Sequence, residues 1–156
     1  MNHTLEQLKL YYRNWSEMPI EAMASVYAED VVFEDPIHKT TGLPDLEAYF
    51  SRSKTALNYG YFEFIDCLTR GNKATLTWTM VWSHPKLRGG QELNLSGCSI
   101  LKFDVSNNKI IQHRDYYDVS ELLFDHLPIL GRLTQFLKTR VAGTNSAEQE
   151  PNYHPH

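Results

Sequence analysis

Four long segments with alternating apolar and polar residues dominate the second half of the chain and limit the folds that it can adopt. They cover residues 59–68, 73–83, 91–104 and 109–118, separated by the turn-forming pairs Gly71-Asn72, Gly89-Gly90 and Asn107-Asn108. A period of two is typical of half-buried strands, and such pairs are typical of tight turns. The pattern therefore predicts a four-stranded antiparallel meander with one buried face.

Residues of one parity share one face of a strand, so the alternation also assigns the buried side chains. On that face we expect Leu76, Trp78, Met80 and Trp82, then Leu93, Leu95, Gly97, Ser99, Leu101 and Phe103, and finally Ile111, His113, Asp115 and Tyr117. We interpret Trp78, Met80 and Trp82 as core and cavity wall rather than as a cofactor-binding motif. Their breadth would suit a flat or polycyclic ligand.

Three helical patterns precede these strands. Residues 4–15 carry a buried stripe with Tyr11 at its edge, a second helix starts at Pro19, and a third follows Gly42 with Pro44 in its first turn. The apolar positions at helical spacing are Leu5, Leu8, Tyr12 and Trp15, then Ile20, Met23, Ala24 and Tyr27, and then Leu46, Tyr49 and Phe50. A curved sheet wrapped over three helices makes an α+β cone with one open end.

A carboxylate, Asp35, ends a short apolar strand predicted over 31–35 and stands directly before a proline. Phe33 and Asp35 share one face of this strand, whereas Glu34 points the other way. Burial among apolar neighbours would raise the pKa of Asp35 and would suit a general base. An aspartate before a proline can also serve only to start a turn, by accepting a backbone N–H two residues on. Both interpretations stay open.

A second carboxylate, Asp115, lies on the apolar face of the last strand beside His113 and Tyr117. It is either an acid or base in a pocket, or a carboxylate paired with Arg114 or with a cation of another subunit. His38 could reach Asp35 from the following loop, and His113 could reach it from across the cone. Two carboxylates at one cavity could divide their pKa values, one ionised as base and the other protonated as acid.

The composition of the chain narrows the range of possible binding partners. A net charge of -4 without a cluster of lysines and arginines argues against nucleic acid or an anionic membrane. The aromatic share of 12% favours a lined cavity for a small apolar molecule within one domain. The N-terminus lacks the pattern of a signal peptide, and no segment has the length of a membrane span, so we expect a cytoplasmic location.

Motifs for other chemistries are missing from the sequence. Cys67 and Cys98 have no cysteine or histidine at metal-ligand spacing, which predicts free thiols. No metal site is predicted. The spacing of His38, His113 and Asp115 in the sequence does not show that they meet in space, and the terminal histidines belong to a polar tail. There is no glycine-rich phosphate loop or nucleophile elbow, so we expect no cofactor.

The end of the chain carries a further helical pattern over 119–141, interrupted by Pro128 and Gly131. Such an extension could cover the pocket, pack on a partner subunit, or lie on a membrane with its basic edge. The segment 143–156 is rich in Asn, Glu, Pro and His and is predicted to be disordered. We therefore expect a single domain over 1–142 with a disordered tail.

Two motifs resemble the cone-shaped family of nuclear transport factor 2, which includes ketosteroid isomerase, limonene epoxide hydrolase and the SnoaL-like polyketide cyclases. The first is Tyr27-Ala-x-Asp, a short strand, Asp35-Pro36 and a glycine that opens an amphipathic helix. The second is His113-Arg114-Asp115-Tyr116-Tyr117-Asp118. The resemblance covers roughly residues 4–118. It implies three N-terminal helices on a curved, mostly antiparallel sheet, and a homodimer that pairs its sheets face to face.

The resemblance also implies roles for single residues. Asp35 corresponds to the general base of ketosteroid isomerase, and Asp115 to the acid or base of the epoxide hydrolases and cyclases. Tyr11 precedes Asp35 at the spacing of the isomerase tyrosine that stabilises the enolate oxygen, although it could equally be a core tyrosine. The isomerase's protonated aspartic acid is absent, since Ser99 takes that position. The Arg-x-Asp of limonene epoxide hydrolase has no counterpart in 77–82.

Two functions follow from these observations. The first is a cofactor-free isomerase, cyclase or hydratase that acts on a small apolar carbonyl or polycyclic compound through the catalytic candidates Asp35, Asp115, Tyr11 and His113. The second is a non-catalytic module for ligand binding or dimerisation, because a fold does not determine a function. In either case the expected ligand-binding residues are Phe33, His38, Trp78, Met80, Trp82, Ser99 and Tyr117.

Overall fold

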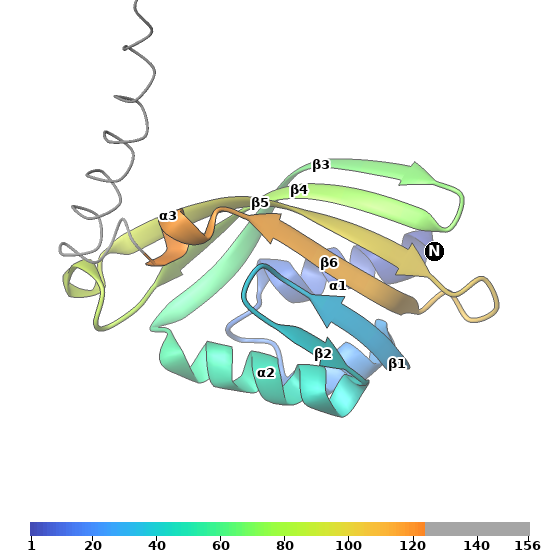
Figure 1. The fold of residues 1–156 in the computed structure, drawn as a ribbon, viewed down its shortest axis with the longest axis horizontal. Helices are drawn as coiled ribbons and strands as arrows, with labels where there is room; N and C mark the ends of the chain where they lie inside the picture. Colours follow the sequence, from blue (N-terminus) through green and yellow to red (C-terminus); the bar gives the residue numbers. More distant parts are fainter. Residues whose placement is uncertain (124–156) are drawn as a thin grey trace, which may run out of the picture.

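The computed structural model describes residues 1–123; the predicted tail and most of the predicted helix over 119–141 lie outside the described residues. Figure 1 shows helices gathered on one side of a single sheet. In chain order the elements are α1 (Asn2–Arg13), the 3₁₀ helix η1 (Ile20–Ser25), β1 (Tyr27–Glu34), β2 (Lys39–Thr41), α2 (Leu43–Ala56), β3 (Tyr59–Arg70), β4 (Lys73–Ser83), the 3₁₀ helix η2 (Arg88–Gly90), β5 (Glu92–Phe103), β6 (Ile110–Tyr117) and α3 (Val119–Leu123).

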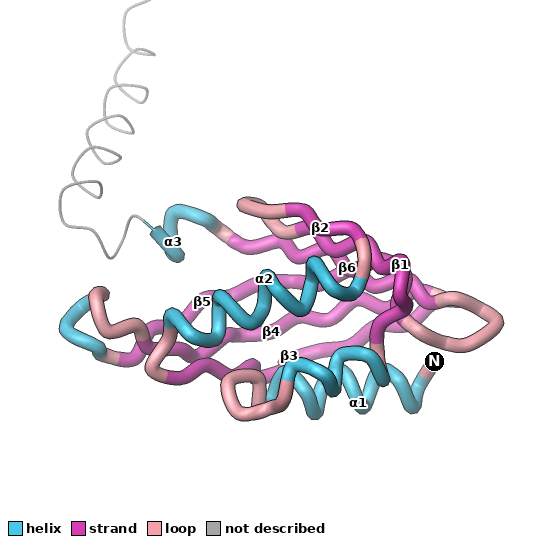
Figure 2. Tube along the Cα trace, turned by 90° about the horizontal axis from the view of Figure 1, so that it is seen from below, coloured by secondary structure: helices cyan, strands magenta, loops and turns pink. Residues whose placement is uncertain are grey.

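The six strands form one sheet in the order β2-β1-β6-β5-β4-β3. Strands β3 to β6 pair antiparallel with their neighbours, which confirms the predicted meander. Strand β1 adds to its edge by pairing parallel with β6, and β2 pairs antiparallel with β1. Helices α1 and α2 lie across the same face of the sheet (Figure 2). The predicted α+β architecture, a curved and mostly antiparallel sheet over N-terminal helices, is confirmed.

The region between α1 and α2 differs in detail from the prediction. The second helix is a short 3₁₀ helix that ends at Ser25, and Tyr27 belongs to β1 instead. Tyr27 pairs with Ile110 of β6, and the backbone N–H of Ile110 donates to the carbonyl of Val26 at 3.0 Å. This long-range pairing overrides a helical pattern of only two turns. The short strand β2 was not predicted.

The predicted buried face of the sheet is largely confirmed. Leu76, Trp78 and Trp82 of β4 are buried, as are the alternating residues Leu93, Leu95, Ser99, Leu101 and Phe103 of β5. A register shift between β5 and β6 brings Ile110 to this face in place of Ile111. A second irregularity interrupts β3 between Phe64 and Asp66, and such bulges bend a strand around what lies beneath it.

Gly97 of β5 leaves the space that part of the cavity wall needs. A Cβ atom at this position would lie 2.7 Å from Cζ3 of the Trp78 indole, which is too close for real side chains. The indole therefore lies directly over the backbone of Gly97 and reaches Ser99 on the same strand. Within residues 1–123, no helix has the length and apolar character needed to cross a bilayer.

Candidate functional site

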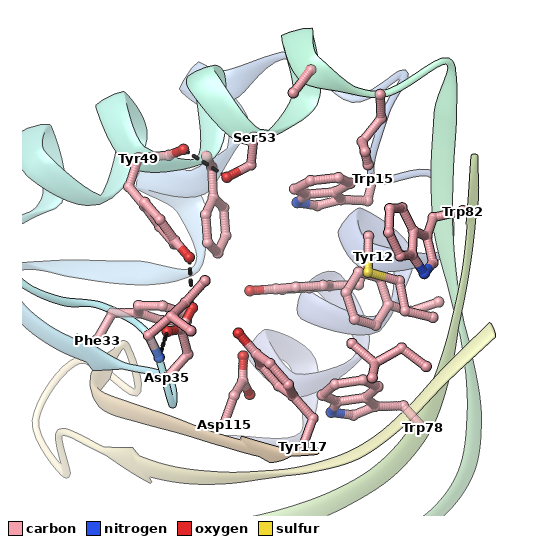
Figure 3. A pocket seen from close by; sticks show the side chains of 17 residues that line it. Tyr12, Trp15, Phe33, Asp35, Tyr49, Ser53, Trp78, Trp82, Asp115 and Tyr117 are labelled. Carbon is pink, nitrogen blue, oxygen red and sulfur yellow. Dashed lines mark hydrogen bonds between the residues drawn. The ribbon is translucent and has the colours of Figure 1, made fainter. Parts of the chain in front are cut away.

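A cavity of about 250 Å³ lies between the sheet and helices α1 and α2 (Figure 3). This volume is slightly below the usual range of small-molecule sites, roughly 300–1,000 Å³. The part of its wall formed by residues 1–123 is mainly aromatic, contains no lysine, arginine or histidine, and holds two carboxylates. The lining residues are Tyr12, Trp15, Phe33, Asp35, Ile37, Tyr49, Phe50, Ser53, Ala56, Leu57, Phe62, Trp78, Met80, Trp82, Leu95, Asp115 and Tyr117.

Asp35 lies directly after β1 and has both a turn-forming and a cavity-facing oxygen. Its Oδ1 accepts hydrogen bonds from the backbone N–H groups of Ile37 at 2.8 Å and His38 at 2.7 Å. Its Oδ2 accepts a hydrogen bond from the Tyr49 hydroxyl of α2 at 2.6 Å. The turn and the cavity thus share this side chain, so the two interpretations of Asp35 are compatible in one geometry.

Asp115 enters the cavity from β6 and is held by one oxygen only. Its Oδ1 accepts from the Ser99 hydroxyl at 2.5 Å and from Nε2 of His113 at 2.8 Å. Ser99 in turn accepts from the indole N–H of Trp78 at 2.8 Å. Among the described residues, no donor is hydrogen-bonded to Oδ2 of Asp115. This oxygen is therefore available to a bound molecule, while its partner oxygen fixes the orientation of the carboxylate.

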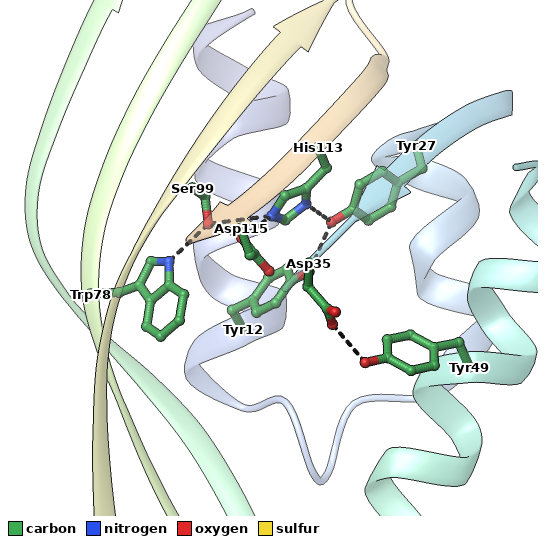
Figure 4. Close-up of polar contacts among 8 residues, drawn as sticks. All are labelled: Tyr12, Tyr27, Asp35, Tyr49, Trp78, Ser99, His113 and Asp115. Carbon is green, nitrogen blue, oxygen red and sulfur yellow. Dashed lines mark hydrogen bonds and ion pairs between the residues drawn. The ribbon is translucent and has the colours of Figure 1, made fainter. Parts of the chain in front are cut away.

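A buried chain of hydrogen bonds continues behind Asp115 (Figure 4). Nδ1 of His113 lies 2.7 Å from the Tyr27 hydroxyl, which lies 2.9 Å from the Tyr12 hydroxyl. Nε2–H of His113 donates to the carboxylate, and Nδ1 is hydrogen-bonded to the Tyr27 hydroxyl. His113 has only 2% of its side chain exposed, so its ring is locked in place. The chain makes Asp115 rigid.

The phenols around the carboxylates stay protonated at neutral pH. Burial raises the pKa of Tyr49, and the hydrogen bond to Asp35 and its negative charge add to the shift. Burial also raises the pKa of Tyr117, with further contributions from the charges of Asp35 and Asp115. Tyr49 and Tyr117 are therefore hydrogen-bond donors beside two acceptors.

The structure brings most of the predicted site residues to this cavity. Phe33, Asp35, Trp78, Met80, Trp82, Asp115 and Tyr117 line it. Ser99 and His113 stand behind Asp115 and are absent from the lining of the main cavity; with Asp115 they border an adjoining void of about 10 Å³. His38 stacks on the ring of Tyr49, with centroids 4.7 Å apart, on the side of the loop.

Tyr11 is not brought to the cavity. Its hydroxyl accepts a hydrogen bond from Nζ of Lys54 in α2 at 2.8 Å, and its ring lies 4.6 Å from that nitrogen. The neighbouring Tyr12 lines the cavity instead. Both tyrosines are buried, so the apolar stripe of α1 alone does not show that Tyr11 faces helix α2 and Tyr12 faces the cavity.

Sequence reasoning missed Tyr12, Tyr27 and Tyr49 as polar members of the site, and Trp15 as part of its wall. Tyr12, Trp15 and Tyr49 carried a signal, since each was predicted on the buried stripe of its helix. Tyr27 was also predicted on an apolar stripe, but it was assigned to a helix, whereas it belongs to β1. Within residues 1–123, no three His, Cys, Asp or Glu side chains gather closely enough to hold a metal ion.

Solved structures with the same fold are numerous, although their sequences are distant. A protein with a ketosteroid isomerase-like fold from Catenulispora acidiphila DSM 44928, in complex with trimethylamine, has a TM-score of 0.68 at 15% identity, covering 78% of this chain and 92% of its own. A protein assigned to the SnoaL-like polyketide cyclases, from Shewanella denitrificans OS-217, has a TM-score of 0.67 at 18% identity, covering 78% and 95%.

A third similar structure is AclR, a proposed hydroxylase from Streptomyces galilaeus. It has a TM-score of 0.67 at 14% identity and covers 95% of this chain and 99% of its own. A comparison with curated proteins gave no significant match. The model of the SnoaL-like domain matches residues 8–113, which run from within α1 to within β6 and include Asp35 but not Asp115. With most of its length matched in this way, the chain belongs to the SnoaL-like domain family.

Proposed function

We propose that this protein binds a small, flat carbonyl compound in the cavity and uses Asp35 and Asp115 as an acid/base pair on it. The observation that carries the proposal is that both carboxylates, from strands far apart in the sequence, line one aromatic cavity. Similar structures assigned to polyketide cyclases support the class of ligand, and one bound to trimethylamine supports a ligand-holding role for this fold.

The hydrogen bonds suggest different tasks for the two carboxylates. The free Oδ2 of Asp115 suits a group that takes a proton from carbon next to a carbonyl and returns it to another position. Ser99 and His113 would act as positioning residues that keep this oxygen aimed at the ligand. Asp35, which holds Tyr49 at 2.6 Å, would serve as the second acid or base. Such proton transfer is the shared step of isomerisation, cyclisation and hydration.

The test is hydrogen exchange at carbon. A flat bicyclic ketone, 1-tetralone, is small enough for a cavity of about 250 Å³, and proton NMR in D₂O follows loss of its hydrogens next to the carbonyl. We expect the protein to accelerate exchange, and Asp115→Asn to reduce the rate by about 10²-fold or more. Asp30→Asn, which changes an exposed carboxylate on β1, is the matched control.

A non-catalytic binding module is the second candidate. The observation that favours it is that Asp35 already accepts hydrogen bonds from two backbone amides, as a turn-forming residue does. In that case 1-tetralone would bind, detected by a shift of cavity resonances, but its exchange rate would equal the rate in buffer. Equal exchange rates for the wild type and Asp115→Asn would likewise overturn the catalytic proposal.

We also propose that the protein forms a homodimer through the outer face of its sheet. Leu68, Ile100 and Tyr116 are 67%, 42% and 45% exposed. The register places Leu68 and Ile100 in one row with Thr75 between them, and Tyr116 on the neighbouring row. Apolar side chains on adjacent strands of an open face suit a sheet-to-sheet contact with a second copy.

A further inference from the structure

The indole N–H of Trp15 is a buried donor for which residues 1–123 provide no hydrogen-bond partner. Trp15 is 4% exposed, and among the described residues no acceptor lies within hydrogen-bond distance of its Nε1. A buried donor without an acceptor costs about 1–3 kcal/mol, so native proteins seldom retain one without a use. Trp78, another tryptophan of the cavity, differs because its indole N–H donates to the Ser99 hydroxyl at 2.8 Å.

Trp15 also lines the cavity that holds the two carboxylates. Figure 3 shows its indole nitrogen turned toward the middle of the cavity, across from Asp35 and Asp115. Nearby polar groups are already engaged, because the Ser53 hydroxyl donates to the carbonyl of Tyr49 at 3.0 Å. The indole N–H of Trp15 is therefore a donor that a molecule in the cavity could use.

The charge near Trp15 favours an electron-rich partner. Nζ of Lys54 lies 5.7 Å from the centroid of the Trp15 ring and is held by the Tyr11 hydroxyl and the carbonyl of Met18, both at 2.8 Å. This end of the cavity thus has a cation behind it, whereas the other end has two carboxylates. A ligand atom at Trp15 should be an acceptor, and an anionic or strongly polarised oxygen would fit best.

We propose that Trp15 Nε1–H binds an acceptor oxygen of the ligand at the end remote from the reacting carbon. This inference rests on the proposed function and narrows its substrate to flat carbonyl compounds that carry a second oxygen, such as a ketone or phenolate, about the length of the cavity away. Nε1 is shielded from water in the empty cavity, so the side chains of this wall adjust slightly when the ligand binds.

A matched pair of ligands isolates this oxygen. 6-Acetyl-1-tetralone and 6-isopropyl-1-tetralone share the ring ketone and have similar shapes, but only the first has a remote acceptor. Nitrogen–proton correlation NMR resolves the three tryptophan indole N–H signals, and Trp15→Phe assigns that of Trp15. We expect the acetyl compound to move the Trp15 signal downfield and the isopropyl compound to leave it in place.

Binding constants provide the second readout. The wild type should prefer the acetyl compound by roughly fivefold, the effect of one net hydrogen bond. Trp15→Phe should abolish this preference, whereas Trp82→Phe, the same loss of size at another wall position, should retain it. Equal binding of both compounds with an unmoved Trp15 signal would overturn this inference alone. Binding of neither compound would overturn it together with the proposed function.

Discussion

The contact between Gly97 and Trp78 gives a sharp prediction about how the cavity wall is built. In Gly97→Ala, the new Cβ would lie 2.5 Å from Cζ2 and 2.7 Å from Cζ3 of the Trp78 indole. Trp78 is 3% exposed and packs edge-on against Phe62, so the indole cannot move without disturbing its neighbours. Its displacement would also break the hydrogen bond to Ser99 and loosen Asp115.

The cost can be worked from these contacts. Overpacking of a core typically costs about 1–3 kcal/mol, and loss of one hydrogen bond adds about 1 kcal/mol. Gly97→Ala should therefore lower the free energy of unfolding by roughly 2–4 kcal/mol. For a domain of this size the melting temperature would fall by roughly 5–15 °C.

A double-mutant cycle in urea distinguishes this clash from a general effect of alanine in a strand. Trp78→Phe removes the outer indole atoms that the new Cβ meets. In the Trp78→Phe background, Gly97→Ala should lower the free energy of unfolding by less than about 1 kcal/mol. The coupling energy between the two positions would then be about 1 kcal/mol or more. The reasoning would be refuted if Gly97→Ala were as stable as the wild type, or if its cost were the same with Phe at position 78.

Three further predictions concern the support of Asp115, the half-buried Lys54 and the dimer. Ser99→Ala leaves the Trp78 indole N–H unpaired and should cost about 1–3 kcal/mol in urea unfolding; a change under about 0.5 kcal/mol would contradict the network. Burial lowers the pKa of Lys54 from 10.5 to about 8, so between these values the unfolded chain binds more protons and the wild type should gain stability as pH rises. The Lys54→Met variant should lack this gain when unfolding curves of both proteins are measured across this pH range. An identical dependence of the free energy of unfolding on pH in the two proteins would contradict the prediction. Ile100→Glu should produce monomers in sedimentation velocity at concentrations where the wild type is dimeric, and an unchanged dimer would exclude this face.

The regular part of the fold was predictable because local signals agree along it. Strands β3 to β6 fall within two residues of the predicted segments, since alternation and turn pairs such as Gly71-Asn72 mark the same limits. Strand β1 was predicted too short, because its first residue, Tyr27, pairs with Ile110 far along the chain. No local pattern encodes such a pairing.

The site was predictable in its carboxylates and less so in the groups that support them. Asp35 and Asp115 were found because each is a charge on an apolar strand face. The choice of Tyr11 over Tyr12 depended on a spacing, whereas the actual orientation depends on Lys54 from another helix. The sequence left open that His113 could reach Asp35 from across the cone, but its Nε2 is hydrogen-bonded to Asp115 two residues along the same strand.

The most direct test of the central claim is a high-resolution crystal structure of the protein with 1-tetralone. The account predicts the ketone in the cavity between α2 and β6, with Oδ2 of Asp115 within about 3.5 Å of the carbon next to the carbonyl. A cavity filled by rearranged side chains, or an Asp115 carboxylate turned away to pair with Arg114, would contradict it.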